Sequence, residues 1–548
     1  MRPRDLTRLE SGPYDLLVVG GGIHGLACAY DAASRGLRVA LVEADDFGSG
    51  ASFNHQKTAH GGLRALGAGR FGLARESVRE RRALARIAPW FLRPLPFLVG
   101  TYRSAVKSRL ALRAAFKLDA WLGRHRNDGV EPELHLPAPR LVSKAATLRL
   151  FLGVRPERLT GGAQWYDYQM VEGDRLTLAF AAAADRAGAD LVNHAGAIEA
   201  LRGEGRISGM LVRDRLTGQT VPVHARVTLN AAGARAGEVM AMFGVRRPFP
   251  LLKAMNLVTS KPASDMALGA PAPGGRMLTL VPWRGRALVG TSQSSTLVEP
   301  GDTTVTDAEL DGFIADANYA FPSLKLSRAD ITLVHRGVVP AVTTAGRPEL
   351  KPSSEILDHT SDGAEGAMTV VGVKYSTARA LAERATRTAA RRLGKRVPPS
   401  RTATTTLPGA GIADHEALAI ETARDLRFDI ALPAIRHLIG LYAEAAADIV
   451  RLMHERPELR APVAPGVKTV GAEVVHVIRR EMAVCLTDIV VRRTGMGSAG
   501  APPREAVAAC ARIAAAELGW GQPRVAEEIA AVEHVYALPG VPAVKEHI

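Results

Sequence analysis

The sequence predicts an α/β protein with a nucleotide-binding sheet, a second and mainly antiparallel sheet, and a helical domain at the C-terminal end. Three observations carry this prediction. A glycine-rich unit of strand, turn, helix and strand stands near the N-terminus. Apolar runs that end in small-residue turns recur twice further along the chain. Beyond residue 400, Ala, Leu, Glu and Arg recur at helical spacing.

The first unit begins at residues 14–25, which read YDLLVVGGGIHG, and its second strand, RVALVEA, contains Glu43. Gly20, Gly22 and Gly25 form a G-x-G-x-x-G turn between strand and helix. Such a turn needs one glycine for the tight bend, one to let the backbone approach a pyrophosphate, and one for close helix packing. Glu43 is placed to accept from ribose hydroxyls, which argues against a 2′-phosphate. The unit therefore predicts an adenine dinucleotide ligand other than NADP.

Two later segments, RVTLNAAGARAG at 226–237 and AMTVVGVKYSTAR at 367–379, repeat the pattern of apolar strand and small-residue turn. We expect them to join the first strand in one parallel sheet whose carboxyl ends meet at a shared ligand. Residues 253–260, 277–281 and 287–291 are predicted strands of the second sheet, with a hairpin turn at Arg284 and Gly285.

The predicted domains are discontinuous, because the repeated segments lie far apart in the chain. A Pro, Ser and Thr-rich connector follows Gly394 and marks the start of the helical domain. We assign 12–100, 160–240 and 330–395 to the nucleotide-binding domain, 101–159 and 241–329 to a domain that caps the site, and 400–548 to the helical domain.

The composition is that of a globular protein: 47% of the 548 residues are apolar and 23% are charged. No run of about eighteen uncharged apolar residues is present to span a bilayer. Cys28, Cys485 and Cys510 have neither disulfide nor metal-ligand spacing, so we expect them in the core and expect no metal. The polar N-terminus lacks a signal-peptide pattern and predicts a cytoplasmic protein.

The net charge of +15 is concentrated between residues 64 and 126. Without zinc ligands or aromatic RNA-binding motifs, this charge does not predict a nucleic-acid partner. One interpretation is contact with an anionic lipid surface through the apolar residues set among the cations, which are Trp90, Phe91, Leu92, Leu95 and Phe97. The other, equally weighted, is a solvated arginine face over an ordinary core.

Several motifs together resemble the FAD-dependent glycerol-3-phosphate dehydrogenases, and the resemblance covers nearly the whole chain. They are GGGIHG, SFNHQKTAHGGLRAL at 52–66, NAAG at 230–233, HRGVVP at 335–340, VVGVKYSTARALAE around Lys374, and the C-terminal stretch that ends CLTDIVVRRT. The resemblance implies an FAD-binding Rossmann-like domain of the glutathione-reductase or D-amino-acid-oxidase type. It also implies oxidation of sn-glycerol 3-phosphate to dihydroxyacetone phosphate, with electrons passed to a membrane quinone by a peripheral membrane protein. A homodimer is compatible with the sequence, which gives no view of oligomeric state.

The same resemblance suggests site residues by position. FAD would contact Gly20, Gly22, Ile23, His24, Gly25, Glu43, Ala44, Ser52, Lys57, Thr58, His60, Gly61, Gly62, Ala197, Ala232, Gly233, Gly372, Lys374, Tyr375, Ser376 and Thr377. Arg64, Arg336 and Lys374 would hold the phosphate and oxygens of the substrate, since guanidinium and ammonium groups suit a phosphate dianion. Lys374 and His60 are the two candidate bases, and His60 fits better as a residue that orients the flavin loop.

The chain departs from the family pattern at four pocket positions. Ala65 replaces a tyrosine, Asn256 a histidine and Gln293 an acid, while Glu355 falls loosely where the family has an arginine. Changes to buried polar groups alter substrate discrimination strongly. Three functions therefore remain open: glycerol 3-phosphate oxidation, a dehydrogenase or oxidase of the same fold that acts on another hydroxy or amino substrate, and a flavin-binding protein without turnover.

Overall fold

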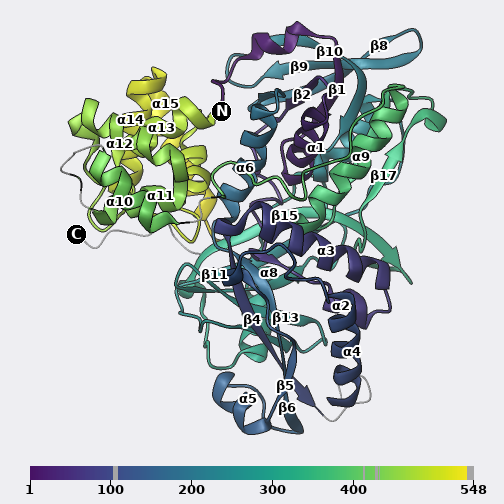
Figure 1. Ribbon diagram of the computed structural model, residues 1–548, viewed down its shortest axis with the longest axis vertical. Coiled ribbons are helices and arrows are strands. Elements are labelled where there is room, and N and C mark those ends of the chain that lie inside the picture. The colour runs from purple at the N-terminus through teal and green to yellow at the C-terminus, as the bar shows by residue number, and fades with distance from the viewer. Residues whose placement is uncertain (103–108, 412–413, 426–429, 431, 540–548) are drawn as a thin grey trace.

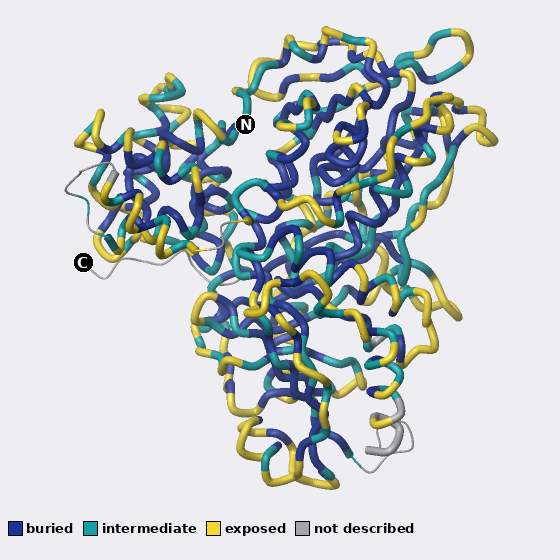
Figure 2. The backbone as a smooth tube through the Cα atoms, in the orientation of Figure 1, coloured by how far each residue is buried: buried dark blue, intermediate teal, exposed yellow. Residues whose placement is uncertain are grey.

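The structure is a computed structural model that describes residues 1–102, 109–411, 414–425, 430 and 432–539. Two sheets form the body of the molecule, and the C-terminal helices form a lobe beside them (Figure 1). Backbone in the interior of both sheets and of the lobe is buried, and exposed positions gather in the loops and at the lower end of the view (Figure 2).

The first sheet has the strand order β17-β18-β10-β1-β2-β7. Its central strands are parallel, and the pairings of β1 with β10 and of β10 with β18 confirm that the three repeated segments share one sheet. The strands are β1 (Tyr14–Val19), β2 (Val39–Val42), β7 (Asp190–Val192), β10 (Thr220–Asn230), β17 (Glu355–Asp358) and β18 (Ala367–Val371), and an antiparallel ribbon of β8 (Ala195–Gly203) and β9 (Arg206–Asp214) extends β10.

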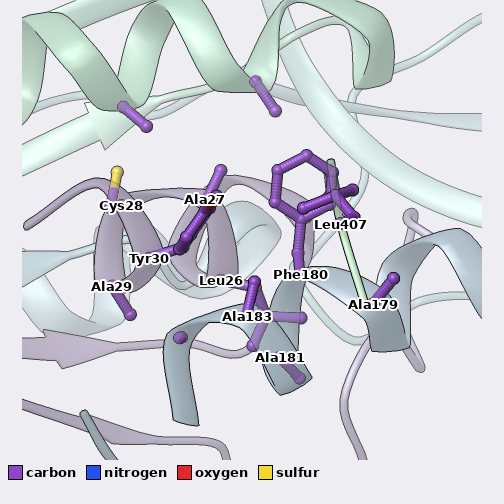
Figure 3. Packing of buried hydrophobic residues seen from close by; sticks show 14 of the residues in the cluster. Leu26, Ala27, Cys28, Ala29, Tyr30, Ala179, Phe180, Ala181, Ala183 and Leu407 are labelled. Carbon is purple, nitrogen blue, oxygen red and sulfur yellow. The ribbon is translucent and has the colours of Figure 1, made fainter. Parts of the chain in front are cut away.

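Alanine-rich helices cover this sheet. Helix α1 (Ile23–Ser34) packs against α6 (Gly173–Arg186) and α9 (Ala378–Arg392). Figure 3 shows the small side chains of α1 and α6 meeting around the ring of Phe180, which also meets Tyr30 edge to face. Because alanine side chains are short, the helices can approach one another closely. Cys28 lies in this core, as predicted.

The second sheet has the order β16-β15-β11-β14-β13-β12-β4-β6-β3, with β5 beside β6. Its strands are β3 (Thr58–Ala59), β4 (Leu92–Tyr102), β5 (Arg140–Val142), β6 (Leu159–Met170), β11 (Leu251–Thr259), β12 (Ala267–Pro271), β13 (Met277–Trp283), β14 (Arg286–Gln293), β15 (Ile331–Thr344) and β16 (Arg347–Leu350). The predicted hairpin is confirmed, because β13 and β14 pair up to Trp283 and Arg286 across Arg284 and Gly285, which both have positive φ.

The remaining helices lie around the second sheet and in the C-terminal lobe. Around the sheet these are α2 (Leu63–Gly67), α3 (Phe71–Ile87), α4 (Arg109–Leu122), α5 (Lys144–Leu150) and α8 (Asp307–Ala320), while α7 (Ala236–Met242) follows β10. The lobe contains α10 (His415–Asp425), α11 (Leu432–Tyr442), α12 (Ala446–Glu455), α13 (Gly471–Glu481), a π-helical turn at Asp488–Arg493, α14 (Arg504–Leu518) and α15 (Gln522–Tyr536). Its apolar core includes Cys510 and continues onto Phe53 and Trp283 of the body.

The sheets divide the chain differently from the predicted domains at five strands. The second sheet contains β3, β4, β6, β15 and β16, although the sequence ranges place them wholly or mostly in the nucleotide-binding domain. Three of these, β4, β6 and β15, are long strands that pair with their neighbours in the second sheet. The domain boundaries themselves remain a prediction.

The interpretation of residues 90–97 as a lipid contact is wrong. Phe91, Leu92, Leu95 and Phe97 are each at most 3% exposed, and the Trp90 indole donates a 2.9 Å hydrogen bond to the Gly440 carbonyl of α11. These side chains face the core, so they offer nothing to a membrane. Among the described residues, no helix combines the length and the apolar character needed to cross a bilayer.

Candidate cofactor and substrate site

The turn after β1 requires glycine at two positions. Gly20 has a φ of 112°, and a Cβ there would lie 2.6 Å from the Ala231 carbonyl oxygen. A Cβ on Gly25 would collide with the Gly20 carbonyl. Larger residues would therefore separate α1 from β1 and from the turn after β10.

Gly22 and Ser52 shape the start of α1. Gly22 is the N-cap residue, and the hydroxyl of Ser52 accepts a 2.9 Å hydrogen bond from the Ile23 N–H. A Cβ on Gly22 would meet only that hydroxyl, at 3.2 Å, so this side of the turn stays open. An open helix N-terminus with free N–H groups is suited to a pyrophosphate.

The Glu43 carboxylate closes the other side of the turn. It accepts from the Gly21 N–H and, at 2.7 Å, from the Asp45 N–H. Burial raises the pKa of Glu43 to about 7, against the effect of those two hydrogen bonds. Ala44 and Ala197 lie on the same edge, since Ala195 donates to the Glu43 carbonyl and a Cβ on Gly196 would touch Ala44.

The third turn, residues 372–377, contacts the first turn at His24. A Cβ on Gly372 would collide with the His24 ring, so glycine is required there. Burial lowers the pKa of His24 to about 4, against a hydrogen bond with the Lys374 backbone. The turn also contacts segment 52–62, because the Tyr375 ring stacks on His55 with centroids 4.7 Å apart. Ser376 and Thr377 are buried at the start of α9.

Segment 52–62 is fixed by two buried ion pairs. Lys57, fully buried, donates to the Phe53 carbonyl at 2.7 Å and to Asp174 of α6 at 3.0 Å. Burial lowers the pKa of Lys57, and Asp174 opposes that shift. The side chain is thus an anchor beneath the segment.

Asp167 of β6 forms the second anchor. Its carboxylate accepts from the Gly61 N–H at 2.7 Å, from the Trp165 indole at 3.1 Å and from buried Arg81. Burial raises the pKa of Asp167, but Arg81 and His60 more than compensate, so it stays below its usual value. A Cβ on Gly61 would strike the Arg81 guanidinium, and Gly62 has a φ of 88°.

His60 is held at both ring nitrogens. Nε2 lies 2.9 Å from the Thr58 hydroxyl, and Nδ1 lies 3.4 Å from Asp167. The ring also meets Phe97 edge to face. Two partners fix the orientation of the imidazole, which favours the orienting role over that of a base.

Asn256 of β11 faces segment 52–62. It pairs with His335 of β15, and the directly opposed side chains of such a pair share one face of the sheet. His335 lies against Phe53 and Asn54, and a Cβ on Gly290 beside Asn256 would approach Gln56. This face of the second sheet therefore meets the edge where the turns of the first sheet gather.

Arg336 extends from the other face. It pairs with Met255, which packs in the core beneath α8, and its neighbours His335 and Gly337 point toward segment 52–62. Burial lowers the pKa of Arg336, and no ion pair reaches its guanidinium from the described residues. The register thus separates Arg336 from Asn256, which the sequence analysis placed in one pocket.

The other predicted pocket residues lie on three separate elements, α2, β14 and β17. Ala65 lies in α2 directly after the Gly61–Gly62 turn, and the side chain of Arg64 lies outside the described residues. Gln293 ends β14 opposite Ala254. Glu355 stands on β17 of the first sheet and pairs with Lys351 at 3.3 Å.

The sequence did not reveal the charged residues that fix segment 52–62 in place. Asp167, Arg81 and Asp174 carry no local motif, and each reaches its partner across at least 80 residues. His335 stands inside the quoted HRGVVP motif and could have been singled out from it.

One further group could accept a cation. Among the described residues, His194, Cys485 and Asp488 bring one ligand atom each within 4.8 Å of one another. Asp488 already accepts from Arg492 and from the N–H groups of Val484 and Cys485. With a guanidinium on the carboxylate, this group is an ion-pair network, and we assign it no metal.

The features of this edge fit an adenine dinucleotide. Gly22 leaves the helix N-terminus open, Glu43 accepts from the turn at the end of the second strand, and the buried Nε2 atoms of His24 and His55 lack a partner within the described part of the chain. Buried polar atoms are normally bonded, so a bound group is expected beside them.

Comparison with known proteins identifies the dinucleotide. Residues 15–384 match the model described as FAD dependent oxidoreductase, and residues 400–525 match the C-terminal domain of alpha-glycerophosphate oxidase. A glycerol-3-phosphate dehydrogenase of Synechocystis is 31% identical over 90% of both chains. The chain belongs to the FAD-dependent glycerol-3-phosphate dehydrogenase family. The predicted fold and the predicted FAD cofactor are thereby confirmed.

Other members of the family are similarly distant. Glycerol-3-phosphate dehydrogenase 2 of Mycobacterium tuberculosis is 30% identical over 95% of this chain and 88% of its own length. The solved glycerol-3-phosphate dehydrogenase of Bacillus halodurans, complexed with FAD, has a TM-score of 0.75 and 24% identity, and the match covers 97% of this chain and 96% of that one. That likeness shows the shared fold.

Proposed function

We propose that this protein oxidises glycerol 3-phosphate to dihydroxyacetone phosphate, using FAD bound at the carboxyl edge of the first sheet. The observation that carries the proposal is the sequence match to glycerol-3-phosphate dehydrogenases over both the oxidoreductase and the C-terminal regions. Bound FAD supplies the acceptor for a hydride from the carbinol carbon.

The protein supplies binding and orientation. Glu43 would accept from the ribose hydroxyls, and the N–H groups of the first turn of α1 beyond Ile23, whose own N–H is bonded to Ser52, would bind the pyrophosphate. The third turn, residues 372–377, and segment 52–62 would hold the flavin at the edge where Tyr375 meets His55. His60, held by Thr58 and Asp167, orients the segment.

Arg64 and Lys374 are the proposed ligands of the substrate phosphate and oxygens. Lys374 follows β18 in the third turn, on the edge where Tyr375 meets His55. In its neutral form, the Lys374 amine is also the proposed acceptor of the hydroxyl proton, which converts it to the ammonium ion. Arg336 remains a prediction from the family resemblance, and its place on the Met255 face of β15 speaks against it.

A second function is favoured by a specific observation, the neutral amide at Asn256 on the face that meets segment 52–62. Together with Ala65, it makes the pocket wider and removes an ionisable donor. A different hydroxy or amino substrate on the same fold is therefore the alternative.

We further propose that electrons pass to a membrane quinone and that the contact is peripheral. The side chains suited to anionic lipid lie at the α5 end of the molecule (Figure 1), where Leu150 and Leu152 are exposed. Lys144, Arg149 and Arg155 lie in the same stretch of chain. Exposed leucines among cations are typical of an interfacial contact.

Anaerobic mixing with glycerol 3-phosphate tests the activity. Loss of flavin absorbance near 450 nm is expected, followed by recovery with a short-chain quinone faster than with air. Recovery with air alone would make the protein an oxidase, and absence of bleaching with this substrate but not with another would support the alternative. Flotation with anionic vesicles, compared between wild type and Leu152→Ser, tests the lipid contact.

A further inference from the structure

The π-helical turn Asp488–Arg493 of the C-terminal lobe reaches into the nucleotide-binding domain. Arg493 is fully buried and donates to both oxygens of Asp46, at 2.6 Å each. Arg492 donates to the same carboxylate through Nε, also at 2.6 Å. Two guanidinium groups from consecutive residues thus bind one carboxylate that is itself 0% exposed. Turns of this kind are rare and often stand at functional sites.

Asp46 belongs to the loop that shapes the FAD turn. Glu43, three residues earlier, accepts from the Gly21 N–H. Phe47, the next residue, packs against Gly21, and the Gly48 N–H donates 3.0 Å to the Gly21 carbonyl. A shift of Asp46 would therefore move the ribose ligand and the phosphate-binding backbone together.

The end of β7 completes the contact. The Asn193 amide donates to Asp46 at 3.0 Å and to the Met482 carbonyl of the lobe at 2.8 Å. Arg493 also donates to the Glu481 carbonyl. Burial of Asp46 raises its pKa, but Arg493 and Arg492 outweigh that effect and hold the carboxylate ionised.

We propose that Arg492 and Arg493 are positioning residues that act on the FAD site through Asp46. In this role they couple docking of the C-terminal lobe to the affinity of the protein for FAD. The proposal rests on the FAD site described above and assigns the lobe a role in retaining the cofactor. Because coupling between two binding events is reciprocal, bound FAD must tighten the docking of the lobe by the same factor.

A second buried ion pair between lobe and body provides a matched control. Arg175 of α6 binds Glu481 of α13 through two hydrogen bonds of 2.7 Å. This pair crosses the same interface with a similar geometry, and among the described residues no hydrogen bond joins either side chain to the loop at 43–48. Arg493 bonds Glu481 at its backbone carbonyl, which Glu481→Gln keeps. A purely structural role would make the two ion pairs equivalent.

The test compares FAD affinity in Asp46→Asn, Arg492→Gln and Glu481→Gln. Apoprotein is titrated with FAD, and binding is followed by quenching of FAD fluorescence. We expect Kd to rise by about tenfold or more in the first two variants, within the range of about 5- to 150-fold typical of coupled sites. In Glu481→Gln we expect Kd within about twofold of wild type, although its thermal midpoint falls.

Arg492→Gln keeps the proposal testable if Asp46→Asn does not fold, because Arg492 is partly exposed and Arg493 still binds Asp46 in that variant. The rise in thermal midpoint on adding FAD is the second readout, and it should shrink in the Asp46 and Arg492 variants alone. Unchanged Kd in these variants, or an equal rise in Glu481→Gln, would overturn the proposal. Failure of wild-type apoprotein to bind FAD would instead contradict the cofactor assignment.

Discussion

The hydroxyl of Thr291 donates a 2.8 Å hydrogen bond to Oδ1 of Asn256, on the sheet face that meets segment 52–62. This bond holds the neutral amide of Asn256 in place, at a position where the family resemblance implies a histidine. Nothing at this position can carry charge, so a phosphorylated substrate must rely on cations from other elements.

This relationship leads to the first prediction. Wild-type activity on glycerol 3-phosphate should be present but weak, and the double change Ala65→Tyr with Asn256→His should raise kcat/KM at least tenfold, about 1.4 kcal/mol of transition-state stabilisation. Steady-state kinetics with an artificial acceptor measures it. Wild-type kcat/KM above about 10⁴ M⁻¹s⁻¹ without improvement in the double variant would show that the two replacements are compensated elsewhere.

The second prediction concerns the open side of the phosphate turn. Gly22→Val should lose most of its FAD, because the added side chain would occupy the space beside Ser52 where the pyrophosphate approaches. Flavin released on denaturation measures occupancy. Gly312→Val in α8, where a Cβ would meet nothing within 4 Å, is the matched control and should keep its FAD. Full occupancy in Gly22→Val would contradict the placement of the pyrophosphate.

A pH dependence follows from Glu43. Burial raises its pKa to about 7 without cofactor, and ribose hydroxyls donate to the ionised form. FAD affinity should therefore increase as pH rises through about 7, level off above it, and be accompanied by proton release. Titrations at pH 6, 7 and 8 measure the trend. Glu43→Gln should bind weakly at all three values, and a wild-type Kd independent of pH would remove Glu43 from the site.

A substitution of Arg336 distinguishes the role implied by the family resemblance from the role expected from the strand register. The resemblance predicts that Arg336→Ala raises the Michaelis constant sharply without loss of flavin. The register predicts little change, because Arg336 leaves β15 on the face of Met255 rather than that of Asn256. We expect the register to prevail, with KM within about threefold of wild type, the scale of a lost surface charge. An increase of tenfold or more would restore the phosphate-binding role.

Asp167 should carry a large share of local stability. Asp167→Asn removes the charge that buried Arg81 requires, and losing one partner of a buried ion pair costs about 3 to 5 kcal/mol. Urea unfolding measures the change. Glu416→Gln, whose partner Arg436 is exposed, should leave the free energy of unfolding close to that of wild type, because water screens the pair. Equal effects in the two variants would show that the Asp167 cluster is dispensable.

The sequence predicted the parts of the fold that local patterns encode. The glycine turn, the three parallel strands and the hairpin at Arg284 each need only short-range signals, and all are present. The interpretation of residues 90–97 failed because an apolar run does not reveal whether it faces lipid or core, and β4 pairs on both sides within the second sheet.

The supporting residues of the site could not be predicted for a different reason. Arg493 meets Asp46 across 447 positions of sequence, and Asp167 meets Arg81 across 86. Such partners are defined only once the sheets and the lobe have docked. The face on which Arg336 lies depends on a strand register that no local pattern sets.

FAD at this edge is expected to accept electrons from glycerol 3-phosphate. Anaerobic titration of the purified yellow protein with glycerol 3-phosphate, monitored at 450 nm, tests it most directly. We expect saturable bleaching in wild type, and we expect it to be lost in Lys374→Ala that has been reconstituted with FAD. A flavin that stays fully oxidised at saturating glycerol 3-phosphate, in wild type and in Ala65→Tyr with Asn256→His alike, would contradict the claim.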